Sequence, residues 1–143
     1  MMKKHTFLLV FGFFASTLVF ANELITKSPE NARVYFISPT DGETVSGEVT
    51  VQFGLSGMGV PPAGSNVKNT GHHHILINKD VSEIDVSSPL PATDQVKHFG
   101  GGQTETVLKL PKGKHTLQLL LGNYAHIRHD KPVISEKITV TVK

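Results

Sequence analysis

The chain contains no cysteine among its 143 residues. Disulfides, iron–sulfur clusters and thiolate zinc sites are therefore excluded, and metal ligation is restricted to His, Asp, Glu, Met or backbone groups. A domain without disulfides is held together by burial of apolar side chains. About 120 residues are enough to form one such core.

The sequence also lacks a second long hydrophobic run. The run that is present spans residues 7–20, follows Lys3 and Lys4, and ends at Ala21, a small residue suited to signal cleavage. This pattern predicts a signal peptide over residues 1–21, with an uncleaved anchor as the alternative. The run is too short for a comfortable transmembrane span. We therefore expect a periplasmic or secreted protein with no stable membrane span after signal cleavage.

An excess of charge is missing as well. The formal net charge is +2, and removal of Lys3 and Lys4 with the signal peptide leaves a formally neutral mature chain. Because phosphate binding needs clustered Lys and Arg, we expect no nucleic-acid partner. The three glycines at 100–102 lack the spacing and following helix of a phosphate loop, which excludes that mode of nucleotide binding.

What the chain does contain is a series of short alternating segments. Val49, Val51 and Phe53 fall on one face of a period-two pattern, which is typical of a half-buried strand. About seven such segments occur at sandwich-like spacing, separated by Gly, Pro, Asn and Ser. The sequence therefore predicts an all-β fold, with a polar lead-in at 22–31 and a single immunoglobulin-like β-sandwich at 32–143. Residues 79–97 are expected to form a long crossover loop with at most one helical turn.

Three consecutive histidines open one of the predicted strands. Alternation places His73 on the apolar face with Ile75, and leaves His72 and His74 side by side on the other face. Residues two apart on a strand are roughly 6.5 to 7 Å apart at Cα, close enough for two imidazoles to share an ion. His73 is expected to be partly buried, neutral and hydrogen-bonded. The alternative is that His72 and His74 belong to a polar strand end that faces solvent and bind no ion.

Further histidines lie at loop boundaries. His126 follows the end of the leucine-rich strand, whereas His72 begins its own strand, and antiparallel pairing would bring those two ends together. His98 would complete the cluster if the crossover loop returns to the same end. The candidate metal ligands are therefore His72, His74, His98 and His126, with His129 in reserve.

Two other residues have simpler interpretations. His115 enters the leucine-rich strand just after a turn, where an aromatic side chain with a polar tip often bonds back to a neighbouring loop. Met58 is the only methionine of the mature chain and lies in a Gly- and Pro-rich loop, which is weak support for a soft copper ligand.

Four histidine-bearing blocks follow one another along the chain: GHHHILI at 71–77, HFGGGQTE at 98–105, GKHTLQL at 113–119 and GNYAH at 122–126. In this order the sequence resembles an exported bacterial family, domain of unknown function 4399. The resemblance implies an exported, single-domain, immunoglobulin-like β protein and brings no established activity.

The chain departs from that family at two positions. Members often have Asp where this chain has Asn123, and Pro where it has Arg128. Neither change removes a histidine, but Asn123 loses a possible carboxylate ligand or hydrogen-bond acceptor.

These observations favour a histidine-rich periplasmic domain that binds a metal ion, copper or zinc, without catalysing a reaction. The alternative is an envelope module that binds a protein or glycan, in which the histidines are structural. An enzyme ranks third, because no nucleophile motif or paired-carboxylate pattern stands out.

Overall fold

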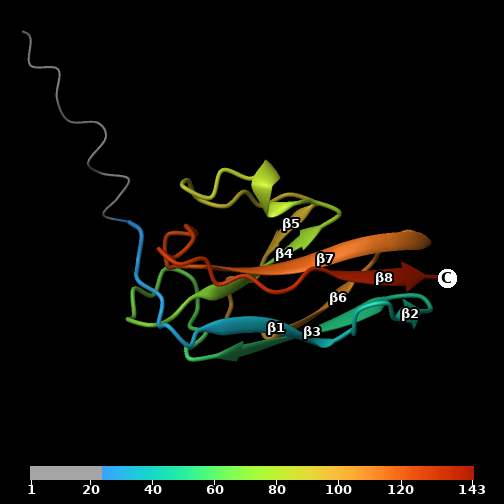
Figure 1. Cartoon of the computed structure of the whole chain (residues 1–143), viewed down its shortest axis with the longest axis horizontal. Helices are drawn as coiled ribbons and strands as arrows, with labels where there is room; N and C mark the ends of the chain where they lie inside the picture. The colour runs from blue at the N-terminus through green and yellow to red at the C-terminus, as the bar shows by residue number, and fades with distance from the viewer. Residues whose placement is uncertain (1–23) are drawn as a thin grey trace, which may run out of the picture.

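A computed structural model describes residues 24–143 as two packed β-sheets (Figure 1). One sheet has the order β1-β3-β6 and the other has the order β2-β8-β7-β4-β5. The strands of the first sheet are β1 (Arg33–Ser38), β3 (Val49–Ser56) and β6 (Glu105–Leu108). Those of the second are β2 (Thr44–Val45), β8 (Ile138–Val142), β7 (Gly113–Gly122), β4 (His72–Ile77) and β5 (Val96–His98). The only helical element in this part of the chain is the 3-10 turn η1 (Val81–Glu83).

The predicted all-β sandwich is confirmed. Residues 24–143 form eight strands rather than about seven, because β2 and β5 are only two and three residues long. No helix within residues 24–143 is long and apolar enough to cross a membrane. The predicted signal peptide at 1–21 lies outside the described residues.

The main core lies between the two sheets and follows the period-two alternation. Phe53 of β3, Ile75 of β4 and Leu119 of β7 all point into it and are buried. Leu76 and Leu120, which alternate with them, point to the opposite face of the five-stranded sheet and are buried in a second cluster. All six residues of β4 are consequently buried. This strand is covered on both faces.

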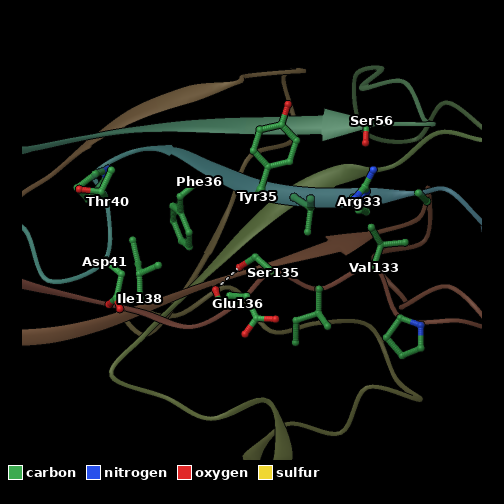
Figure 2. A pocket seen from close by; sticks show the side chains of 15 residues that line it. Arg33, Tyr35, Phe36, Thr40, Asp41, Ser56, Val133, Ser135, Glu136 and Ile138 are labelled. Atoms are coloured by element: carbon green, nitrogen blue, oxygen red, sulfur yellow. Dashed lines mark hydrogen bonds between the residues drawn. The ribbon is translucent and has the colours of Figure 1, made fainter.

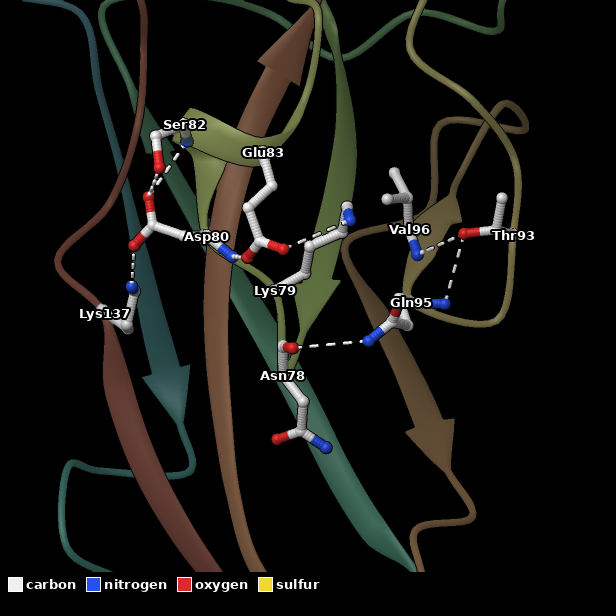
Figure 3. A network of polar contacts seen from close by, with 9 residues as sticks. All are labelled: Asn78, Lys79, Asp80, Ser82, Glu83, Thr93, Gln95, Val96 and Lys137. Atoms are coloured by element: carbon white, nitrogen blue, oxygen red, sulfur yellow. Dashed lines mark hydrogen bonds and ion pairs between the residues drawn. The ribbon is translucent and has the colours of Figure 1, made fainter.

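The crossover segment between β4 and β5 supplies the second cover. It lies across the outer face of the five-stranded sheet (Figure 1), where Ile84 and Leu90 join the second cluster. Figure 3 shows how the segment is held at both ends. Asp80 caps η1 and pairs with Lys137, which precedes β8.

At the other end of the segment, Thr93 Oγ1 accepts from the backbone N–H of Val96 at 3.1 Å, and Gln95 donates to the carbonyl of Asn78 at 3.3 Å (Figure 3). These contacts lead the chain into β5. The expectation of a loop through residue 97 was wrong at its end, because Val96–His98 pairs with β4. A three-residue strand formed by pairing with a neighbour has too little local pattern to be recognised.

The polar lead-in is attached to the loop that follows β7. Thr26 O accepts from the backbone N–H of Asp130 at 3.0 Å, and the Asp130 carboxylate accepts from the backbone N–H of Ser28 at 3.0 Å. Leu24 O accepts from the side-chain amide of Asn123 at 2.7 Å. Residues 24–31 therefore brace the loop that carries His126.

Candidate metal centre

Four histidines converge on the outer face of the five-stranded sheet. His72 and His74 lie on β4, His98 ends β5, and His126 lies in the loop after β7. One ring nitrogen from each of the four lies within 4.8 Å of the others. Two imidazoles of β4 are thus joined by two from separate segments.

Strand pairing explains the convergence. β4 pairs antiparallel with both neighbours, so that His74 is the register partner of His98 and His72 is the register partner of Gly122. The predicted meeting of the end of β7 with the start of β4 is therefore confirmed. The return of the crossover segment to the same place, which the sequence left open, brings His98 to the cluster.

Two glycines leave room for the imidazole rings. A Cβ atom on Gly122 would lie 2.7 Å from Cε1 of His74, and one on Gly100 would lie 2.7 Å from Cε1 of His98. Real Cβ atoms essentially never approach that closely, so each ring occupies space that a larger residue would take. Close approach is a frequent reason for glycine at such positions.

Asn123 shapes the loop that presents His126. Its Oδ1 accepts from the backbone N–H groups of Ala125 and Ile127 at 2.8 and 3.1 Å, and its Nδ2 donates to Leu24 O. His126 itself has a φ of 61°, an uncommon conformation for a residue other than glycine. Sequence reasoning treated Asn123 only as a lost carboxylate, although its place after a strand-ending glycine suits a side chain that bonds to nearby backbone.

Two of the four histidines are buried and two are half-buried. His72 is 1% exposed and His74 is fully buried, whereas His98 and His126 are half-buried. Burial, together with the neighbouring imidazoles, lowers the pKa of His72 to about 4 and that of His74 to about 3. Burial and His126 also lower the pKa of His98. At neutral pH these three imidazoles are uncharged, the form that binds a metal ion.

Several ring nitrogens of the cluster lack a hydrogen-bond partner. His72 Nε2 lies 3.1 Å from His126 Nδ1, a hydrogen-bond distance, but neither nitrogen of His74 nor Nε2 of His98 has a partner among the described residues. A buried polar group without a partner costs about 1–3 kcal/mol. An ion placed between the four rings would bind the lone pairs that are otherwise left unpaired.

The other three histidines of residues 24–143 lie outside this cluster. His129, the reserve ligand, is buried outside this group, and its Nδ1 lies 2.9 Å from Thr26 Oγ1. His73 points into the sandwich core with its ring 4.9 Å from that of Phe53. It is fully buried, where partial burial was predicted. The predicted hydrogen bond was wrong, because both of its nitrogens lack a partner among the described residues.

His115 has the predicted structural contacts. Its Nε2 donates to Pro111 O at 2.7 Å, and its Nδ1 accepts from Asn78 Nδ2 at 2.9 Å. Met58 packs against the sandwich core. Neither residue belongs to the histidine group.

A cavity of about 820 Å³ lies between β1 and residues 132–138 (Figure 2). Tyr35 and Phe36 line one side, and Ser135 and Glu136 line the other. It includes none of the histidines, so the cluster and this cavity are separate features of the molecule.

The sequence of residues 51–143 matches the family model described as domain of unknown function (DUF4399). The chain belongs to the DUF4399 family. The matched range includes all four clustered histidines of this DUF4399 domain.

No curated protein matches the DUF4399 chain. Among solved structures it is similar to an endo-β-1,4-mannanase from Thermotoga petrophila, with 18% identity and a TM-score of 0.43 over 78% of this chain and 20% of the mannanase. It is also similar to the fibronectin(III)-like modules of Clostridium thermocellum CbhA, with 12% identity and a TM-score of 0.37 over 76% of this chain and 92% of that one. The chain spans about a fifth of the mannanase.

Proposed function

We propose that this DUF4399 domain is a non-catalytic metal-binding domain of the periplasm or of a secreted protein. His72, His74, His98 and His126 bind one zinc or copper ion. Imidazole without thiolate is a donor set that suits these ions. The expected export follows from the leader pattern of the sequence.

The observation that carries the proposal is the lack of partners at buried ring nitrogens. An apolar cluster of similar volume would fill this space without the cost of desolvating polar atoms. His115 has a hydrogen bond at each nitrogen, whereas His73 in the sandwich core has none among the described residues, so missing partners point to an ion only where several rings converge. The two nitrogens of His74 have none among residues 24–143. A metal ion accounts for the convergence of the rings and would bind the lone pair of one His74 nitrogen, while the protonated nitrogen of that ring keeps no partner among residues 24–143.

The non-catalytic part of the proposal rests on the number of donors. Structural zinc sites are closed by four protein ligands, whereas catalytic sites use three and keep one position open. Four histidines offer a ligand atom in this cluster, and no carboxylate belongs to the group within the described residues. Four imidazoles therefore saturate a tetrahedral ion and leave no position for substrate.

Calorimetric titration of the mature protein with Zn²⁺ and with Cu²⁺ tests the proposal. We expect one ion per chain with a Kd below about 10 µM, near −7 kcal/mol. The double variant His72→Ala, His74→Ala should lose this binding, and His115→Ala should keep it because His115 is outside the cluster.

A Kd above about 10 µM for the wild-type protein, or a Kd that is unchanged in the folded double variant, would overturn the proposal. Capture of an envelope protein that persists in strong chelator would then support the alternative binding module. Circular dichroism of each variant establishes that it is folded.

A further inference from the structure

The spacing of the four rings specifies more than the presence of a metal ion. Building on the proposed function, we infer that the cluster is a tetrahedral site that selects Zn²⁺ over Ni²⁺ and imposes a non-planar geometry on Cu²⁺. The six distances between ring centroids and the strands that hold the rings favour this geometry.

The expected distances follow from coordination geometry. With a metal–nitrogen bond of about 2.0–2.1 Å, each imidazole centroid lies about 3.2 Å from the ion. A tetrahedron then places all six pairs of centroids about 5.2 Å apart. A square plane places four pairs about 4.5 Å apart and the two diagonal pairs about 6.4 Å apart.

The observed distances exclude a plane. The centroids of His98 and His126 are 4.4 Å apart, and His72 lies 4.9 Å from His98 and 4.7 Å from His126. His74 lies 5.0 Å from His98 and 5.3 Å from His72. Only His74 and His126 are further apart, at 6.1 Å.

A plane needs a second long diagonal. If His74 and His126 form one diagonal, the other joins His72 to His98, and that pair is 4.9 Å apart. Neither of the other two ways of pairing the rings contains a separation above 5.3 Å. A tetrahedron is approached when the His74–His126 separation shortens by about 1 Å and the His98–His126 separation lengthens by about 0.8 Å, and both changes involve the half-buried His126.

The strands oppose flattening. His72 and His74 are both buried on β4, where His74 is paired with β7 and with β5 and His72 is paired with β7, so strand pairing holds their backbone positions. The ring of His98 lies against Gly100 and is stacked on that of His74 at 5.0 Å. To reach a planar arrangement, His72 and His98 would have to separate by about 1.5 Å within this packing.

The choice of ion follows from geometry. Zinc has no geometric preference from its d electrons and accepts a tetrahedron, whereas Ni²⁺ and Cu²⁺ with nitrogen ligands favour square-planar or tetragonal sites. Hard ions such as Mg²⁺ and Mn²⁺ favour oxygen donors, which the group lacks within residues 24–143. The site should therefore bind Zn²⁺ at least tenfold more tightly than Ni²⁺.

Competitive titration with Zn²⁺ and Ni²⁺, together with the visible spectrum of the Co²⁺-loaded protein, tests the inference. We expect the intense visible bands of tetrahedral Co²⁺, displacement of Co²⁺ by Zn²⁺, and a Kd for Zn²⁺ at least tenfold below that for Ni²⁺. His115→Leu should leave the Co²⁺ spectrum unchanged, whereas His74→Leu should weaken the bands because water replaces one nitrogen. A weak six-coordinate Co²⁺ spectrum, or Ni²⁺ binding as tight as Zn²⁺ binding, would overturn the tetrahedral assignment.

The same experiments separate this inference from the proposed function. If Cu²⁺ binds in a manner that depends on His72 and His74 but has the electron paramagnetic resonance signature of a tetragonal site, metal binding stands and the tetrahedral assignment fails. If Zn²⁺, Ni²⁺, Co²⁺ and Cu²⁺ all fail to bind, the proposed function itself fails.

Discussion

Replacement of His74 by leucine should stabilise the metal-free protein. The side chain is fully buried, its two ring nitrogens have no partner among residues 24–143, and its ring stacks on that of His98 at 5.0 Å. Leucine has a similar volume and contains no polar atom. Its side chain also extends less far toward Gly122 than the imidazole does. His74→Leu therefore removes a buried polar group without opening a large cavity.

The magnitude follows from the cost of an unpaired buried group, about 1–3 kcal/mol. We expect His74→Leu to raise the free energy of unfolding of the metal-free protein by about 1–3 kcal/mol. The same substitution at His115 should lower it by about 1–3 kcal/mol, because His115 has partners at both nitrogens and its removal leaves Pro111 O and the Asn78 amide unpaired.

Urea denaturation in the presence of a strong chelator measures both changes. Repeating it with excess Zn²⁺ should stabilise the wild-type protein and His115→Leu, and should stabilise His74→Leu less because one ligand is lost, since a ligand that binds only the folded state stabilises it by mass action. If His74→Leu destabilises the metal-free protein as much as His115→Leu does, His74 has a structural role and the reasoning from unpaired nitrogens is refuted.

Three further predictions concern the same site. Gly122→Ala should lower metal affinity at least tenfold in calorimetry, because its Cβ would displace the His74 ring. Gly59→Ala is the control and should leave the affinity unchanged, because a Cβ there meets one atom at an ordinary 3.5 Å. Equal effects of the two substitutions would contradict the role of close approach. Asn123→Ala should weaken binding about tenfold by loosening the His126 loop, as loss of supporting contacts does at other metal sites, and wild-type affinity would disprove this role. In the presence of chelator, burial lowers the pKa of folded His74 to about 3, whereas a histidine of the unfolded chain has the ordinary pKa of 6.5. Below pH 6.5 the unfolded state therefore binds more protons, so the free energy of unfolding should be highest above pH 6.5 and should fall as the pH is lowered. A flat profile between pH 7 and 5 would contradict this linkage.

Much of the candidate site could be predicted from local patterns. The period of two along a strand separates His73, which faces the sandwich core, from His72 and His74, which face the other way. Antiparallel pairing then brings the end of β7, and with it His126, to the start of β4. These inferences succeed because side-chain alternation is a property of any extended strand.

His98 and His129 were harder to assign. The position of His98 depends on β5, a three-residue strand that pairs with β4 only after the crossover segment has folded back. His129 lies three residues after His126, yet its Nδ1 is hydrogen-bonded to the hydroxyl of Thr26 in the lead-in. Sequence proximity to a ligand does not establish which way the next side chain of a loop will point.

The sequence by itself therefore determined the all-β class, the face on which each histidine of β4 lies, and the ends of the strands that meet. Only the tertiary structure decided that the outer face of β4 is covered. Ile84 and Leu90, from the crossover segment, form a second apolar cluster there. On the same face, β5 and the loop after β7 bring the rings of His98 and His126 beside His72 and His74, which are buried rather than exposed at a polar strand end. Burial is the sum of contacts between segments far apart in the chain, so the pattern of any single strand cannot specify it.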